Sequence, residues 1–171
     1  MSIAKGAKYL PLLLTLIVIV VDQITKALVV RFIPAYRIGA VFFGGILRII
    51  DVRNHGIAFS VGGSLPAGVR GIIFAAFPIV VLLVLLVYYV RSSDLTILQR
   101  WAIAGILGGG CGNLIDRLFR PDGVVDFIDV RFFGIFGLER WPTFNVADSS
   151  VVVCGILLIL TLFLQERRKH E

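Results

Sequence analysis

The chain is organised around the stretch Gly123-Val124-Val125-Asp126-Phe127-Ile128-Asp129, which is followed a short loop later by Phe144-Asn145-Val146-Ala147-Asp148. Each segment places an aspartate among apolar residues, and the second segment runs directly into a hydrophobic stretch long enough to enter a bilayer. A charged side chain at mid-membrane costs about 2.5–3.5 kcal/mol on insertion scales, so such a residue is usually paired or functional. Two of them, Asp126 and Asp148, suggest an acid–base pair.

The composition predicts a single integral membrane domain over residues 1–171. Of the residues, 58% are hydrophobic and only 16% are charged, and a soluble chain of this length would need more charge to cover its surface. The net charge of +6 does not indicate nucleic-acid binding, because no basic run is interleaved with aromatic residues. We interpret the basic residues as anchors that interact with anionic membrane lipids.

The apolar stretches predict an all-α membrane bundle of four transmembrane helices. A helix needs about 20 residues to cross a hydrocarbon core of about 30 Å, and stretches of this kind cover about residues 9–30, 71–90, 101–119 and 146–165.

Two loops separate these spans on one side of the membrane. The loop 31–67 holds short runs rich in Val, Ile and Phe between glycine-containing turns, which predict a small antiparallel sheet with strands at 38–43, 46–53 and 57–61. An open sheet edge is not tolerated in lipid, so we expect this sheet at the membrane surface. The loop 120–144 holds a short extended segment around Asp126.

Four spans put both termini on one side, where basic residues crowd the short segments. The positive-inside rule then favours cytoplasmic termini. The polar residues near the membrane ends all fall on the outer side: Asp22, Lys26, Asn54, Asn113, Asp116, Arg117, Asp126, Asn145 and Asp148. Their convergence at one depth from separate stretches predicts a functional site.

Several of these residues also have a purely structural interpretation. Asp22 and Lys26 are four apart and share a helix face, so they form either a local ion pair near the interface or a pair that faces the bundle interior. Asn54 and His55 fit a turn between strands. The small-residue spacings in 105–112 let helices approach closely.

The third and fourth spans offer similar alternatives. Asn113, Asp116 and Arg117 share one face at the end of a span and fit a capped, charge-paired helix end. Asn145 fits a helix N-cap, and Asp148 then lies in the first turn, where the helix dipole favours negative charge.

The available chemistry centres on carboxylates. No Ser or Cys stands out as a nucleophile, and His55 is the only histidine outside the tail, so a Ser-His-Asp triad lacks support. No metal-ligand cluster is evident, and we expect neither a metal nor another cofactor. Two aspartates a few ångströms apart share one proton. The ionised member, which we expect to be Asp148, activates water, while Asp126 between Val125 and Phe127 holds the proton.

The chain resembles the bacterial lipoprotein signal peptidases, or signal peptidase II. The resemblance covers nearly the whole chain and rests on these blocks: Asp22-Gln23-x-x-Lys26, Asn54-x-Gly56-x-Ala58-Phe59, Gly108-Gly109-x-x-Gly112-Asn113-Leu114-x-Asp116-Arg117, Val125-Asp126-Phe127 and Phe144-Asn145-x-Ala147-Asp148. It implies an inner-membrane aspartic endopeptidase with a small β-cradle, which cuts a lipid-modified prolipoprotein before its diacylglyceryl cysteine.

By the same resemblance, Asp126 and Asp148 are the catalytic pair. The surrounding polar residues are implied to bind substrate or support the dyad: Asp22, Asn54, Asn113, Arg117 and Asn145. Such a bundle is expected to act as a monomer. We also consider that a cleft opening sideways between spans, lined by the glycine-rich face of 105–112, lets the lipid chains of the substrate stay in the bilayer.

Two other functions compete with this interpretation. Intramembrane acids also mark ion paths, so a small transporter or proton-conducting protein is the main alternative. Against it, the sequence shows no internal repeat, and the acids lie at one depth. The second alternative is a non-enzymatic scaffold whose acids pair with arginines.

Overall fold

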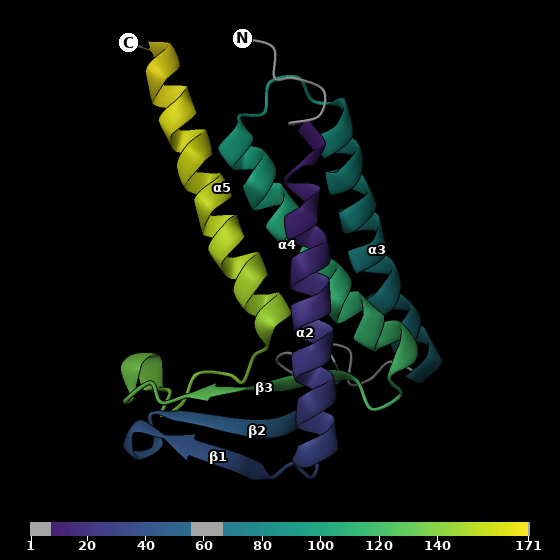
Figure 1. Cartoon of the computed structure of the whole chain (residues 1–171), viewed down its shortest axis with the longest axis vertical. Helices are drawn as coiled ribbons and strands as arrows, with labels where there is room; N and C mark the ends of the chain where they lie inside the picture. Colours follow the sequence, from purple (N-terminus) through teal and green to yellow (C-terminus); the bar gives the residue numbers. More distant parts are fainter. Residues whose placement is uncertain (1–7, 56–66, 171) are drawn as a thin grey trace.

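The computed structural model describes residues 8–55 and 67–170, and in it a bundle of long helices stands on a small sheet (Figure 1). The helices are α2 (Leu12–Phe32), α3 (Ala67–Arg91), α4 (Ile97–Phe119) and α5 (Val146–His170). The strands are β1 (Ile38–Phe42), β2 (Leu47–Asn54) and β3 (Val124–Val130), with short 3-10 turns η1 (Phe43–Gly45) and η3 (Ile135–Gly137). The start of α2 and the end of α5 lie away from the sheet.

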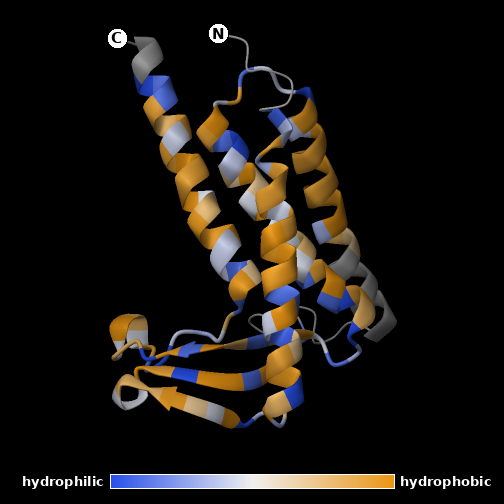
Figure 2. Cartoon of the chain, viewed as in Figure 1, coloured by the Kyte–Doolittle hydropathy of each residue, from blue (hydrophilic) through white to orange (hydrophobic). Residues whose placement is uncertain are grey.

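A helix lies at each of the four positions where the sequence predicts a span. The helix α4 begins at Ile97, before the predicted start, because Thr96 and Gln99 form a reciprocal capping box there. By length and composition, two of the described helices can cross a membrane, α2 and the Val146–Arg167 part of α5; Ala76–Arg91 is a shorter apolar helix. Apolar residues dominate the visible sides of the helices (Figure 2).

The helix α4 is the centre of the bundle and packs against α2, α3 and α5. Its glycines permit this packing: a Cβ on Gly108 would lie 2.8 Å from Cβ of Val18 on α2, and one on Gly110 would lie 2.5 Å from Leu82 on α3. Gly109 meets the backbone of Ala147 on α5. The glycine-rich face is therefore filled by neighbouring helices, and the idea that it lines a substrate cleft is wrong.

Gly112 is a position where we expect a single methyl group to be costly. A Cβ there would lie 2.7 Å from Oδ2 of Asp22 and 3.2 Å from Cβ of Ala147, so Gly112→Ala must displace buried groups. We expect a loss of about 1–3 kcal/mol in the free energy of unfolding, measured as a lower thermal midpoint in detergent. Gly155→Ala on α5 is the matched control, because nothing lies within 4 Å of its Cβ position; an equal loss there would contradict this explanation.

The three strands form one antiparallel sheet in the order β1-β2-β3. The strand β3 comes from the second loop and pairs with β2, so that Val52 lies opposite Asp126 and Asn54 opposite Val124. Asn54 is thus the last residue of a strand, and its interpretation as a turn residue is wrong. The predicted strand 57–61 lies outside the described residues.

The sheet is attached to the end of the bundle by an apolar cluster. Val125 and Phe127 of β3 are buried against Val29 of α2, and Val146 at the start of α5 packs on the same cluster. This packing fixes β3 next to the first turn of α5, which brings the two aspartate-bearing segments together.

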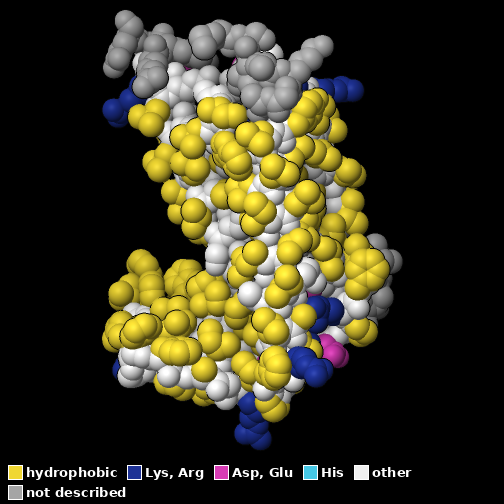
Figure 3. Space-filling model, viewed as in Figure 1, with side chains coloured by type: hydrophobic (Ala, Val, Ile, Leu, Met, Phe, Trp, Pro, Cys, Tyr) yellow, Lys and Arg dark blue, Asp and Glu magenta, His cyan; other side chains and the backbone are white. Residues whose placement is uncertain are grey.

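Residues 131–141, which match no sequence motif, form a compact excursion from the sheet. Asp129 is buried beneath it and binds Arg48 (2.7 Å) and Arg140 (2.6 Å), and the rings of Phe132 and Trp141 lie 4.9 Å apart. The turn η3 at its tip lies at the same end of the sheet as η1 (Figure 1). Hydrophobic side chains cover much of this end (Figure 3).

Candidate active site

The predicted site residues meet where the helices join the sheet. Asp126 lies on β3, and Asp148 lies in the first turn of α5. Their neighbours come from α2, α4, β2 and the residue before α5: Asp22, Lys26, Asn113, Asp116, Asn54 and Asn145.

Asn145 has two roles at the start of α5. Its Oδ1 accepts a hydrogen bond from the backbone N–H of Asp148 (2.9 Å), and Asp148 Oδ2 accepts one from the Asn145 backbone N–H (3.1 Å). This reciprocal cap fixes the amide orientation, so the Nδ2 group is free to donate to Asp126 Oδ1 at 2.7 Å. The predicted N-cap is present, and the same side chain links the two aspartates.

Asn113 joins Asp148 to the side chain of Asn145, and through it to Asp126. Its Nδ2 donates to Asp148 Oδ1 at 2.7 Å, and its Oδ1 accepts a hydrogen bond from Asn145 Nδ2 at 3.0 Å. Asn54 completes the set by donating to Asp126 Oδ2 at 2.9 Å. Each oxygen of both carboxyl groups therefore accepts at least one hydrogen bond from the surrounding chain.

The environments of the two aspartates differ. Asp126 is only 2% exposed, and burial raises its pKa from 3.8 to about 6; the nearby Asp148 charge adds to this rise, while hydrogen bonds from Asn54 and Asn145 oppose it. Asp148 is half-buried at a helix N-terminus, where negative charge is favoured. Below about pH 6, Asp126 thus carries a proton. This direction agrees with the predicted division of roles.

A buried charge cluster supports the site from the side of α2. Lys26 is fully buried and contacts Asp22 (2.8 Å), Asp116 (3.0 Å) and Asn113 Oδ1 (2.9 Å). The other oxygen of Asp22 accepts a hydrogen bond from the backbone N–H of Ala147 at 2.9 Å. The Asp22–Lys26 pair therefore faces the bundle interior, and the interpretation as an interfacial ion pair is wrong.

Two residues that are not among the predicted site residues, Gln23 and Arg120, join this cluster. Gln23 Nε2 donates to the Gly112 carbonyl (3.0 Å) and to Asp116 Oδ1 (3.1 Å). Arg120 binds the same oxygen of Asp116 at 2.9 Å. The four-residue spacing of Asp116 and Arg120 on one helix was a signal that could have identified this pair.

Arg117 is the predicted site residue that the structure does not bring into the cluster. It is exposed, and the described part of the chain gives it no hydrogen bond or ion pair. Successive helical residues point about 100° apart, so the neighbour of the buried Asp116 points away from it. His55 is exposed as well.

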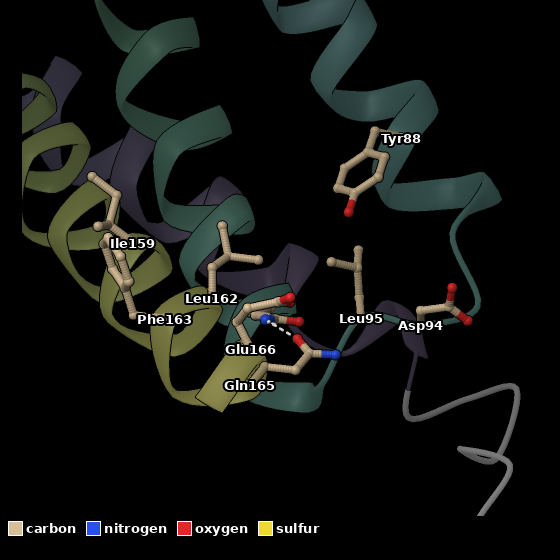
Figure 4. Close-up of a pocket in the computed structure, with 9 residues that line it drawn as sticks. Tyr88, Asp94, Leu95, Ile159, Leu162, Phe163, Gln165 and Glu166 are labelled. Carbon is tan, nitrogen blue, oxygen red and sulfur yellow. Dashed lines mark hydrogen bonds between the residues drawn. The ribbon is translucent and has the colours of Figure 1, made fainter. Parts of the chain in front are cut away.

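A separate cavity of about 580 Å³ lies at the opposite end of the bundle, between the α3–α4 connection and α5 (Figure 4). Its lining includes Tyr88, Asp94 and Phe163, and a hydrogen bond of 2.7 Å joins Gln99 to Gln165 at its edge. Its lining residues on α5, from Ile159 to Glu166, lie about 16–27 Å along the helix from Asp148, at 1.5 Å per residue. We therefore assign the candidate site to the aspartate pair and not to this cavity.

Comparison with known proteins identifies the family. The family model for signal peptidase II matches residues 14–164. A lipoprotein signal peptidase from Treponema denticola is 54% identical over 94% of this chain and 92% of its own length; one from Treponema pallidum is 45% identical over 94% and 86%.

Solved structures agree with this assignment. Two bacterial membrane enzymes match with TM-scores of 0.78 and 0.76 at 28% and 29% identity, over 98% and 94% of this chain and 94% and 95% of theirs. The matching family and relatives are peptidases, so the transporter alternative is not supported. Because the family model and these relatives cover nearly all of the chain, the chain belongs to the signal peptidase II family.

Proposed function

We propose that this chain is an aspartic endopeptidase that removes the signal peptide from diacylglyceryl-modified prolipoproteins by cleaving before the lipidated cysteine. Asp126 and Asp148 act as the catalytic pair. The observation that carries this proposal is the pair of hydrogen-bonded links through Asn145 and Asn113 between two aspartates distant in sequence. The names of the relatives support the substrate class.

The geometry supports a reaction without a covalent intermediate. Asp148, as the ionised member, takes a proton from a water molecule, whose oxygen attacks the scissile carbonyl carbon. Asp126, as the protonated member, donates a hydrogen bond and then its proton to the carbonyl oxygen as charge develops there. When the C–N bond breaks, the proton held by Asp148 goes to the leaving amine, and the carbonyl returns a proton to Asp126.

The proposed setting is the inner membrane, with all four helices crossing it, cytoplasmic termini and the dyad near the outer face. The exposed apolar side chains of α2 and α5 support their insertion in the membrane, and the basic residues near the termini support the cytoplasmic orientation. The sheet then lies at the outer membrane surface, where Phe43 (76% exposed) and Phe136 (88% exposed) at its tip contact lipid. Because one chain supplies both aspartates and their donors, we propose that the monomer is active.

A lipid requirement follows from this setting. The diacylglyceryl chains are too apolar to leave the bilayer, so a lipidated cysteine is held at the depth of the dyad, whereas an unmodified precursor is not. We expect the purified protein in detergent–lipid micelles to cleave a lipidated precursor about 100-fold or more faster than the same precursor without lipid, since each CH₂ kept in an apolar phase contributes about 0.8 kcal/mol. Gel-shift assays of both precursors measure this. Equal cleavage of both would contradict the proposed substrate.

A further inference from the structure

The amide of Asn113 is held at both ends by groups that fix its orientation. Lys26 Nζ donates to its Oδ1 at 2.9 Å, and Asn145 Nδ2 donates to the same oxygen at 3.0 Å. An ammonium group has donors only, so the atom facing Lys26 has to be the oxygen. The NH₂ end of Asn113 consequently faces Asp148 Oδ1 at 2.7 Å.

The reverse orientation of this amide would be strongly unfavourable. It would place an NH₂ group against both Lys26 and Asn145 and an oxygen against Asp148 Oδ1. The last contact would be tolerated only if Asp148 carried a proton. By fixing the orientation of the Asn113 amide, Lys26 thus favours the charged form of Asp148.

The charges around Lys26 indicate that its effect on the dyad comes from orienting the Asn113 amide and not only from its positive charge. Lys26 faces Asp22 and Asp116, and Arg120 faces Asp116 from the other side. The two cations balance the two carboxylates, so the cluster as a whole is neutral before the dyad is considered. Lys26 also lowers the pKa of Asp126 through its charge, but this is the smallest of the effects on that group.

We propose that Lys26 is a positioning residue for the dyad: by holding the oxygen of the Asn113 amide, it directs the NH₂ group of Asn113 at Asp148 and keeps Asp148 the charged member of the pair. This inference rests on the proposed peptidase function. A lysine that only filled the bundle or balanced charge would act independently of Asn113, so its replacement would have the same further effect after Asn113 had been replaced.

The test is a mutational cycle on cleavage of a lipidated precursor. One arm is the double variant Lys26→Met with Asp22→Asn, which removes the ion pair as a whole, since leaving one buried charge unpaired would threaten folding. The other arm is Asn113→Leu, which has a similar shape, keeps the ion pair and cannot donate to Asp148. The third protein combines all three substitutions, and thermal unfolding in detergent verifies that each is folded.

We expect each arm to lower kcat about tenfold or more while KM changes less than about twofold. The acid limb of the kcat–pH profile should move to higher pH, because the dyad has lost a hydrogen-bond donor to its charged member. In the combined protein the limb should stay where Asn113→Leu alone puts it, because Lys26 acts through Asn113. As a matched control, Arg120→Gln removes a cation from the same cluster without touching Asn113 and should leave the limb at the parent position.

Two results would overturn the proposal. One is an acid limb of the kcat–pH profile in Asn113→Leu that is the same as in the parent protein. This variant keeps the Asp22–Lys26 ion pair, so its result can be interpreted even if the lysine variant does not fold. The other is an equal further shift when the ion pair is removed from Asn113→Leu. A parent protein that fails to cleave the lipidated precursor at all would instead count against the proposed function, so the two failures are distinguishable.

Discussion

Asp126→Asn and Asp148→Asn are each expected to lower cleavage of a lipidated precursor by about 10³-fold or more, with the fold retained. Asparagine has the size of aspartate but can neither take a proton from water nor give one to the carbonyl oxygen. Because both oxygens of each carboxyl accept hydrogen bonds, an amide also meets a donor at one position, and we expect a moderate drop in thermal midpoint. Initial cleavage rates and thermal unfolding in detergent measure the two effects separately.

Asp129→Asn is the matched control for these variants. Asp129 is also buried and lies on β3, three residues after Asp126, but its carboxylate binds Arg48 and Arg140 away from the dyad. We expect a loss of about 1–3 kcal/mol in the free energy of unfolding and parent-like cleavage per folded molecule. The account would be wrong if Asp129→Asn abolished cleavage while Asp126→Asn or Asp148→Asn retained it.

Substitution of Asn145 is expected to have the second largest effect, and two variants separate its roles. Asn145→Ser keeps a good helix N-cap but loses the amide that reaches Asp126, so we expect cleavage to fall about 100-fold with little change in thermal midpoint. Asn145→Ala loses the cap as well and should be less stable by about 1 kcal/mol.

The comparison of kcat with thermal midpoint decides between the roles of Asn145. If Asn145→Ser cleaves like the parent, the bridging amide is unnecessary and the residue serves α5 alone. If Asn145→Ser and Asn145→Ala lose cleavage in proportion to stability, the effect lies in the fold and not in the dyad.

The helices were predictable because the length and apolar content of each stretch set their approximate positions. The helix boundaries were less predictable. The helix α4 starts before its apolar run because Thr96 and Gln99 form a capping box there, and hydropathy alone does not detect a cap made of polar residues. The pairing of β3 with β2 joins loops far apart in the chain. Periodicity within one segment carries no information on such a partner.

The site residues were identified by type, spacing and family resemblance, but their directions required the structure. Spacing of three or four residues says that side chains share a helix face without saying which neighbour that face meets. Lys26 therefore remained ambiguous until its burial was known, and Arg117 was grouped with Asp116 although it points elsewhere. Asparagine favours turns, which is why the sequence predicts a turn at Asn54, whereas pairing with β3 holds this residue in a strand.

The most direct test of the central claim is an infrared titration of the two dyad carboxyl groups in protein labelled with ¹³C at the aspartate carboxyls. We predict a protonated carboxyl at pH 5 that disappears with a midpoint of about pH 6, is removed by Asp126→Asn, and coexists with an ionised Asp148. Full ionisation of both groups at pH 5, with Asp126 titrating near the ordinary value of 3.8, would contradict a proton held between the two aspartates.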